Sequence, residues 1–177
     1  MMDFSSPELV SLITKLLIAI ILGAVLGLER SLAKKTAGMR TYALVSLGSA
    51  LFVVIADLAS QMYFNNGLTA GLDPLRIASQ VIVGIGFIGA GTILRREDNK
   101  IEGTTTAASL WVVAAIGIAS GFGFYQEAVA TTVIAYAVLA GLWLVEKYLT
   151  REIRYKTNGV YKELKNGENP GPIDSEK

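Results

Sequence analysis

Few residues in this chain could do chemistry, and the first pattern to stand out is rich in glycine. Residues 84–89 read GIGFIG, the G-x-G-x-x-G spacing that holds a dinucleotide pyrophosphate at a strand-to-helix turn. That use requires a preceding strand and an acidic residue about 20 positions later. Here the run from Ile77 to Leu94 contains no charge and no proline, and as a helix it would cross roughly 27 Å of hydrocarbon. The pattern therefore favours a glycine-rich membrane helix over a nucleotide site.

Asp57 is the ionisable residue that most needs an explanation, because it falls inside an apolar run. A charged side chain at the centre of a membrane helix costs about 2.5–3.5 kcal/mol. Asp57 shares one helical face with Ser46, Ser49, Val53 and Ser60, which form a mostly polar stripe. Two interpretations stay open, namely a hydrogen-bonded seam between helices and a pathway for a cation or a proton.

Other polar residues flank the apolar runs and are candidates for an ion or partner site. Glu29 and Arg30 follow the first run, where a plain interfacial ion pair is the alternative interpretation. Thr105 and Thr106 begin the fourth run, where a threonine can cap a helix and free N–H groups favour anions. The full set of candidates is Glu29, Arg30, Arg40, Thr41, Asp57, Asp73, Arg76, Gln80, Thr105 and Thr106.

Glycines at helical spacing predict close contacts between helices, because a helix without side chains at those positions can be approached by a neighbouring backbone. The third run also carries a stripe of small and polar residues that includes Gln80, Gly84 and Gly91. Trp111, inside the fourth run, is expected to pack inside. The glycines expected at helix contacts are Gly23, Gly27, Gly84, Gly86, Gly89, Gly91, Gly117 and Gly121.

The elements that would position these residues are five membrane-spanning helices. The chain has 177 residues, of which 52% are hydrophobic and 18% charged. An all-α, polytopic membrane domain is predicted over residues 9–145, after an extracytoplasmic N-terminus, 1–8, and before a cytoplasmic tail, 146–177, whose end is expected to be disordered. The first span is interpreted as retained, because it lacks the basic start and the cleavage site of a signal peptide. The predicted spans are 9–28, 42–63, 77–94, 105–122 and 128–145.

The basic residues predict the orientation. All of them except Lys15 and Arg76 fall after the first, third and fifth runs. Because basic loops stay in the cytoplasm, the N-terminus is predicted outside and the C-terminus inside.

The composition excludes several chemistries. The chain has no cysteine and no histidine, which removes thiol chemistry, imidazole acid–base catalysis and the usual zinc and haem ligands. We find no nucleophile paired with a base and no phosphate loop, so an enzyme is not expected, and neither a nucleotide nor a nucleic acid is expected as a partner. No cofactor is expected, and any bound metal would be a hard cation such as Mg²⁺ held by oxygens.

Four blocks of sequence resemble the MgtC/SapB family of bacterial inner-membrane proteins. They are GAVLGLER (23–30), AGMRT (37–41), DPLRIASQVIVGIGFIGAGTIL (73–94) and EGTTTAASLWVVAAIGIASGFGFY (102–125). The resemblance covers all five predicted spans. It is to a short member without the folded C-terminal domain of the virulence-associated members, which also have asparagine where Thr105 stands and cysteine where Val112 stands.

The resemblance implies a multi-pass protein of the cytoplasmic membrane that takes part in magnesium homeostasis and in adaptation to low magnesium. The leading hypothesis is regulation of other membrane proteins through helix contacts, with a homodimer as one option. The alternatives are a small carrier or channel for Mg²⁺ or H⁺, with Asp57 on the pathway, and a scaffold subunit of a larger complex.

Overall fold

The computed structural model describes residues 7–66, 73–95, 97 and 99–142. They form five helices long and apolar enough to cross a membrane, which confirms the predicted all-α, polytopic fold. At about 1.5 Å per residue, even the 18 residues of the third helix reach roughly 27 Å, close to the thickness of a bilayer's hydrocarbon core. The helices are α1 (Pro7–Leu32), α2 (Met39–Asn65), α3 (Pro74–Gly91), α4 (Thr104–Phe122) and an unlabelled fifth helix, Tyr125–Leu142.

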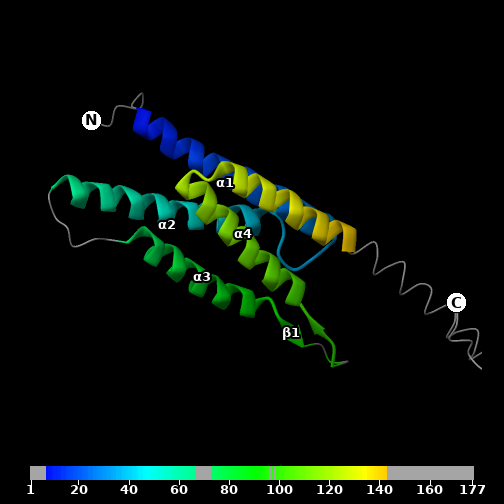
Figure 1. Cartoon of the computed structure of the whole chain (residues 1–177). Coiled ribbons are helices and arrows are strands. Elements are labelled where there is room, and N and C mark those ends of the chain that lie inside the picture. Colours follow the sequence, from blue (N-terminus) through cyan, green and yellow to red (C-terminus); the bar gives the residue numbers. More distant parts are fainter. Residues whose placement is uncertain (1–6, 67–72, 96, 98, 143–177) are drawn as a thin grey trace, which may run out of the picture. The chain divides into compact units, whose positions relative to one another are not determined.

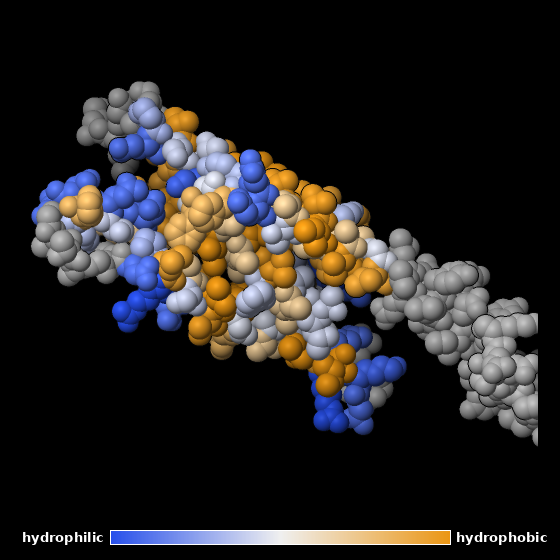
Figure 2. Space-filling model, in the orientation of Figure 1, coloured by the Kyte–Doolittle hydropathy of each residue, from blue (hydrophilic) through white to orange (hydrophobic). Residues whose placement is uncertain are grey.

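Successive helices run in opposite directions, so the chain passes back and forth between two ends of the bundle (Figure 1). The last residues of α1 and α3 and the first residues of α2 and α4 share one of these ends. Figure 2 shows hydrophilic residues mainly toward the two ends and apolar or intermediate residues between them. This is the distribution expected of a bundle that crosses a bilayer.

By its internal contacts the chain divides into two units, Met1–Tyr136 and Ala137–Lys177. The first unit contains α1 to α4 and most of the fifth helix. Of the second unit the structure describes residues 137–142, which are the last turns of that helix. The predicted tail, 146–177, and residues 1–6 of the predicted N-terminal segment lie outside the described residues.

Helix α2 contacts both α1 and α4 through glycines of these neighbours. A Cβ atom at Gly23 of α1 would lie 2.7 Å from the carbonyl oxygen of Tyr42, and one at Gly121 of α4 would lie 2.7 Å from that of Ala50. Because backbone atoms cannot move aside as a flexible side chain can, only hydrogen fits at these positions. The glycines that contact α2 in this way are Gly23, Gly27, Gly117 and Gly121.

The glycines of α3 differ from the expectation. A Cβ atom at Gly89 would meet Ala107 of α4 at an ordinary contact distance of 3.5 Å. Gly84, Gly86 and Gly91 have open space around them, so their predicted packing role does not hold for contacts within the described chain. The reason is that glycine spacing indicates that a helix can be approached closely but carries no information about which helix approaches it.

The expectation that Trp111 packs inside is wrong for this chain, because its side chain is 51% exposed. The buried face of α4 carries Ser109, Val113 and Gly117. At 100° per residue, Trp111 projects from the opposite face to Ser109.

The connection between α3 and α4 is a short hairpin that the sequence did not predict. Helix α3 ends at Gly91, before the end of the predicted span at Leu94, and β1 (Leu94–Arg95) pairs antiparallel with β2 (Ile101–Glu102). Gly103, the N-cap residue before α4, has φ +93°, and a Cβ atom there would overlap the carbonyl group of Thr92. Only glycine combines this backbone angle with so close an approach.

Candidate functional site

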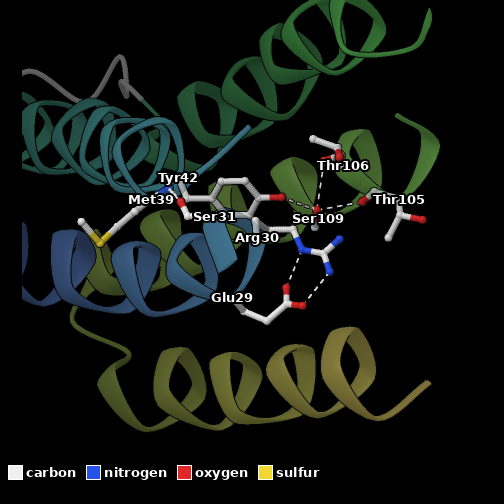
Figure 3. Close-up of polar contacts among 8 residues, drawn as sticks. All are labelled: Glu29, Arg30, Ser31, Met39, Tyr42, Thr105, Thr106 and Ser109. Atoms are coloured by element: carbon white, nitrogen blue, oxygen red, sulfur yellow. Dashed lines mark hydrogen bonds and ion pairs between the residues drawn. The ribbon is translucent and has the colours of Figure 1, made fainter. Parts of the chain in front are cut away.

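A buried polar cluster lies where the end of α1 meets the starts of α2 and α4 (Figure 3). We call it the Glu29 cluster, and its side chains are Glu29, Arg30, Tyr42 and Ser109. The guanidinium of Arg30 donates from Nε to Glu29 Oε2 at 2.5 Å and from Nη2 to Glu29 Oε1 at 2.9 Å. The Arg30 side chain is 3% exposed and that of Glu29 is 13% exposed. The pair is therefore a bidentate ion pair shielded from solvent. Each buried charge is stabilised by the opposite charge of its partner.

The second half of the cluster joins α2 to α4. The Tyr42 hydroxyl lies 2.5 Å from Ser109 Oγ. Ser109 has one hydroxyl proton, and its oxygen lies 2.8 Å from the Thr105 carbonyl and 3.0 Å from the Thr106 carbonyl, both suitable acceptors. We therefore assign the tyrosine as the donor to Ser109.

The glycines of α1 explain how Tyr42 reaches α4. A Cβ atom at Gly27 would lie 2.8 Å from Tyr42 Cβ. Because Gly27 has no side chain, Tyr42 can pack directly against α1. The start of α2 is fixed from the same side, because Ser31 Oγ accepts a hydrogen bond from the Met39 amide at 2.9 Å. Ser31 thereby replaces the side-chain cap that Gly38, the residue before α2, cannot supply.

The polar stripe on α2 is closed over its middle section. Ser46, Ser49 and Val53 are all buried. The Ser49 hydroxyl donates back to the Val45 carbonyl at 2.8 Å, and the Ser46 hydroxyl has no hydrogen-bond partner among the described residues. Both serines lie against the backbone of Gly117. This part of the stripe is a buried, closely packed helix contact.

Asp57, in contrast, lines an open cavity of about 750 Å³ between the first turns of α1 and the last turns of α2. Its carboxylate accepts a hydrogen bond from Gln61 Nε2 at 3.1 Å, and Glu8 and Lys15 also line the cavity. Lys15 Cε lies 3.9 Å from the Cβ position of Gly123, the C-cap residue that follows α4. A lysine beside a helix C-terminus is stabilised by the partial negative charge there.

The other predicted site residues do not join the Glu29 cluster. Asp73 caps α3 by accepting a hydrogen bond from the Leu75 amide at 2.9 Å, and Arg76 is exposed in the first turn of that helix. Arg40 is exposed at the start of α2. Thr41 and Gln80 line a groove between α2 and α3.

Of the predicted candidates, the structure brings together Glu29 and Arg30, while Thr105 and Thr106 take part only through their backbone carbonyls, which accept from Ser109, and the Thr105 side chain is exposed. The sequence did not single out Tyr42 or Ser109 as members of this cluster. Ser109 follows Thr105 and Thr106 at the spacings of one helical face, which is a signal for it. Tyr42 has no such signal, because its role depends on a contact across two helices. Among the described residues, no group of three or more acidic side chains is placed to hold a metal ion.

Together, the five apolar helices and the buried polar cluster at one end define a polytopic membrane protein. A family model described as "MgtC family" matches residues 16–148. The chain belongs to the MgtC family, which confirms the resemblance seen in the sequence, and it is a multi-pass protein of the bacterial inner membrane.

Named relatives agree with this assignment. The chain is 41% identical over 167 residues to the Escherichia coli protein named "Putative magnesium transporter YhiD", covering 92% of this chain and 73% of the relative. It is 39% identical to SapB of Bacillus subtilis and 42% identical to MgtC of Salmonella typhimurium, covering 77% and 69% of this chain. The chain spans 59% of the length of SapB and 48% of the length of MgtC. No solved structure matches the chain significantly.

Proposed function

We propose that this protein takes part in magnesium homeostasis by regulating other membrane proteins through helix contacts, and that it does not itself conduct magnesium. The link to magnesium rests on family membership and on the name of the Escherichia coli relative. The proposed regulatory mode rests on one structural observation, the close packing of α2 against the glycines of its neighbours.

The argument from this contact concerns the route that an ion would take. Mg²⁺ gives up its water reluctantly and prefers six oxygen ligands. The α2 stripe offers only hydroxyl groups over its middle section, and these are buried against glycine backbone. An ion entering beside Asp57 would have to displace α4 from α2 to pass Ser46. This supports a role in which the bundle stays closed.

We further propose that the end carrying the Glu29 cluster faces the cytoplasm. In the described residues this end carries Lys34, Lys35, Arg40, Arg95 and Lys100, while Lys15 and Arg76 lie toward the other end. Such an excess of basic residues is typical of cytoplasmic loops.

A second candidate is a cation carrier, and the cavity beside Asp57 favours it. A carboxylate at the mouth of an open cavity of about 750 Å³ is a reasonable first binding point for a cation. In this alternative the contact of α2 with α4 opens during each transport cycle.

Growth of the host bacterium distinguishes the two candidates. We expect deletion of the gene to slow growth in low magnesium, and we expect both the wild-type chain and Asp57→Asn to restore it. The reason is that Asp57 lies outside the packed region and its side chain contacts only Gln61 by hydrogen bond among the described residues.

The control for this experiment is the amount of each variant in the membrane, measured by immunoblot. Failure of Asp57→Asn to restore growth at a normal membrane level would favour the carrier. Unchanged growth of the deletion strain in low magnesium would contradict a role in magnesium homeostasis altogether.

A further inference from the structure

The described surface of α3 carries a row of exposed positions with the spacing of a coiled-coil seam. Residues 77, 80, 84, 87 and 91 follow one another at intervals of three, four, three and four residues. This is the heptad pattern with which two helices pack at a small left-handed crossing angle. We call these residues, Ile77, Gln80, Gly84, Phe87 and Gly91, the α3 seam.

No described part of the chain covers the α3 seam. All five residues are exposed, and Phe87 is 86% exposed. Gly84 and Gly91 have open space where a Cβ atom would be, on the two sides of Phe87 along the seam. The seam therefore presents one protruding aromatic ring between two hollows.

A groove adjoins the seam. It has a volume of about 740 Å³, lies between α2 and α3, and is almost entirely apolar. Gly48 of α2 and Gly84 of α3 line it, and both have open space around them. Gln80 also lines the groove and contributes a side-chain amide. In lipid such an amide lacks water and gains from a hydrogen-bonding partner on a neighbouring helix.

We infer that the α3 seam binds a second copy of this chain. A two-fold symmetric contact requires a surface that is complementary to itself. The seam meets this requirement, because Phe87 of each copy can enter the hollow at Gly84 and the groove of the other copy. Copies inserted in the same orientation are related by an axis along the membrane normal, so the two α3 helices are parallel and equal residues meet at equal depth.

The polar residue of the seam points to the same occupant. A side-chain amide both donates and accepts, so two Gln80 side chains at one depth can bond to each other. The segment 146–177 of this chain is a poor occupant for an apolar groove in a membrane, because it is rich in charged residues. The inference does not depend on the proposed function, since a regulator or a carrier could equally be a dimer.

Disulfide crosslinking in membranes tests the seam, and the chain suits it because it contains no cysteine. We expect Gln80→Cys to give an oxidised product of twice the chain's mass. The matched control is Ser79→Cys, the preceding residue of α3, which is also exposed and at a similar depth but projects about 100° around the helix from Gln80, outside the seam. It should give little of this product.

A second pair of variants tests the protruding ring. Phe87→Ala should weaken the dimer of purified protein roughly tenfold, which corresponds to about 1.4 kcal/mol. Phe64→Ala, the same change at an 80% exposed position of α2, should leave it unchanged. Because both side chains are exposed, neither variant should alter the helix content seen by circular dichroism.

Several results would overturn the inference. They are equal crosslinking of Gln80→Cys and Ser79→Cys, a Gln80→Cys product joined to a different protein, or a purified wild-type chain that remains monomeric at every concentration measured. Equal weakening by Phe87→Ala and Phe64→Ala would also contradict it.

Discussion

Glu29→Ala is expected to be among the most damaging single substitutions in this protein. It leaves the Arg30 guanidinium, 3% exposed, without its hydrogen-bond partner among the described residues. Removing one member of a buried ion pair costs about 3–5 kcal/mol, because the remaining charge stays buried and uncompensated. We expect a large fall in the midpoint of unfolding in mixed detergent micelles and a low level of protein in the membrane.

The test of this prediction is a double-mutant cycle. Arg30→Met should destabilise less than Glu29→Ala, because the Glu29 carboxylate left behind is more exposed than the guanidinium. The double variant Glu29→Ala/Arg30→Met should regain much of the lost stability, since it buries no unpaired charge. Additive effects of the two substitutions would show that the pair is not coupled and would contradict the description of the Glu29 cluster.

The second large effect is expected at Gly117. A Cβ atom there would overlap the carbonyl oxygen of Ser46 and lie 2.9 Å from both the Ser46 carbonyl carbon and Ser49 Cβ. Gly117→Ala must therefore push α4 away from α2. Overpacking of this kind typically costs about 1–3 kcal/mol, and here the displaced atoms belong to the backbone. We expect a lower midpoint of unfolding and a weakened hydrogen bond between the hydroxyl groups of Tyr42 and Ser109.

Gly86→Ala is the matched control, because the same change falls in the same kind of helix but in open space. It should leave the midpoint of unfolding unchanged or slightly raised, as expected for alanine in a helix. If Gly117→Ala and Gly86→Ala were equally stable, the close contact of α2 with α4 would not exist as described.

Much of the fold was predictable because a membrane helix needs a long apolar run, and such runs are read directly from the sequence. The hairpin between α3 and α4 was not, because two-residue strands carry no periodicity. It depends on local features such as Asn99, with φ +63°, whose side chain accepts a hydrogen bond from Arg95 at 2.8 Å.

The candidate site was predictable only in part, for a related reason. Glu29 and Arg30 stand out as charges beside an apolar run, and they are adjacent in the sequence. Tyr42 and Ser109 lie far apart in the sequence, and their contact requires the crossing of α2 and α4. The α3 glycines illustrate the same limit of sequence analysis. Their spacing indicates that another helix can pack closely against α3, but it does not identify that helix.

The proposal that this protein does not conduct magnesium is tested most directly by flux into liposomes. Purified wild-type chain would be reconstituted into liposomes that enclose a magnesium-sensitive dye, with protein-free liposomes and Asp57→Asn as comparisons. Because the α2 stripe is closed against α4 at Ser46 and Ser49, magnesium should enter no faster with the wild-type chain than without protein. Entry that is clearly faster with the wild-type chain and is lost in Asp57→Asn would contradict the proposal and establish the carrier in its place.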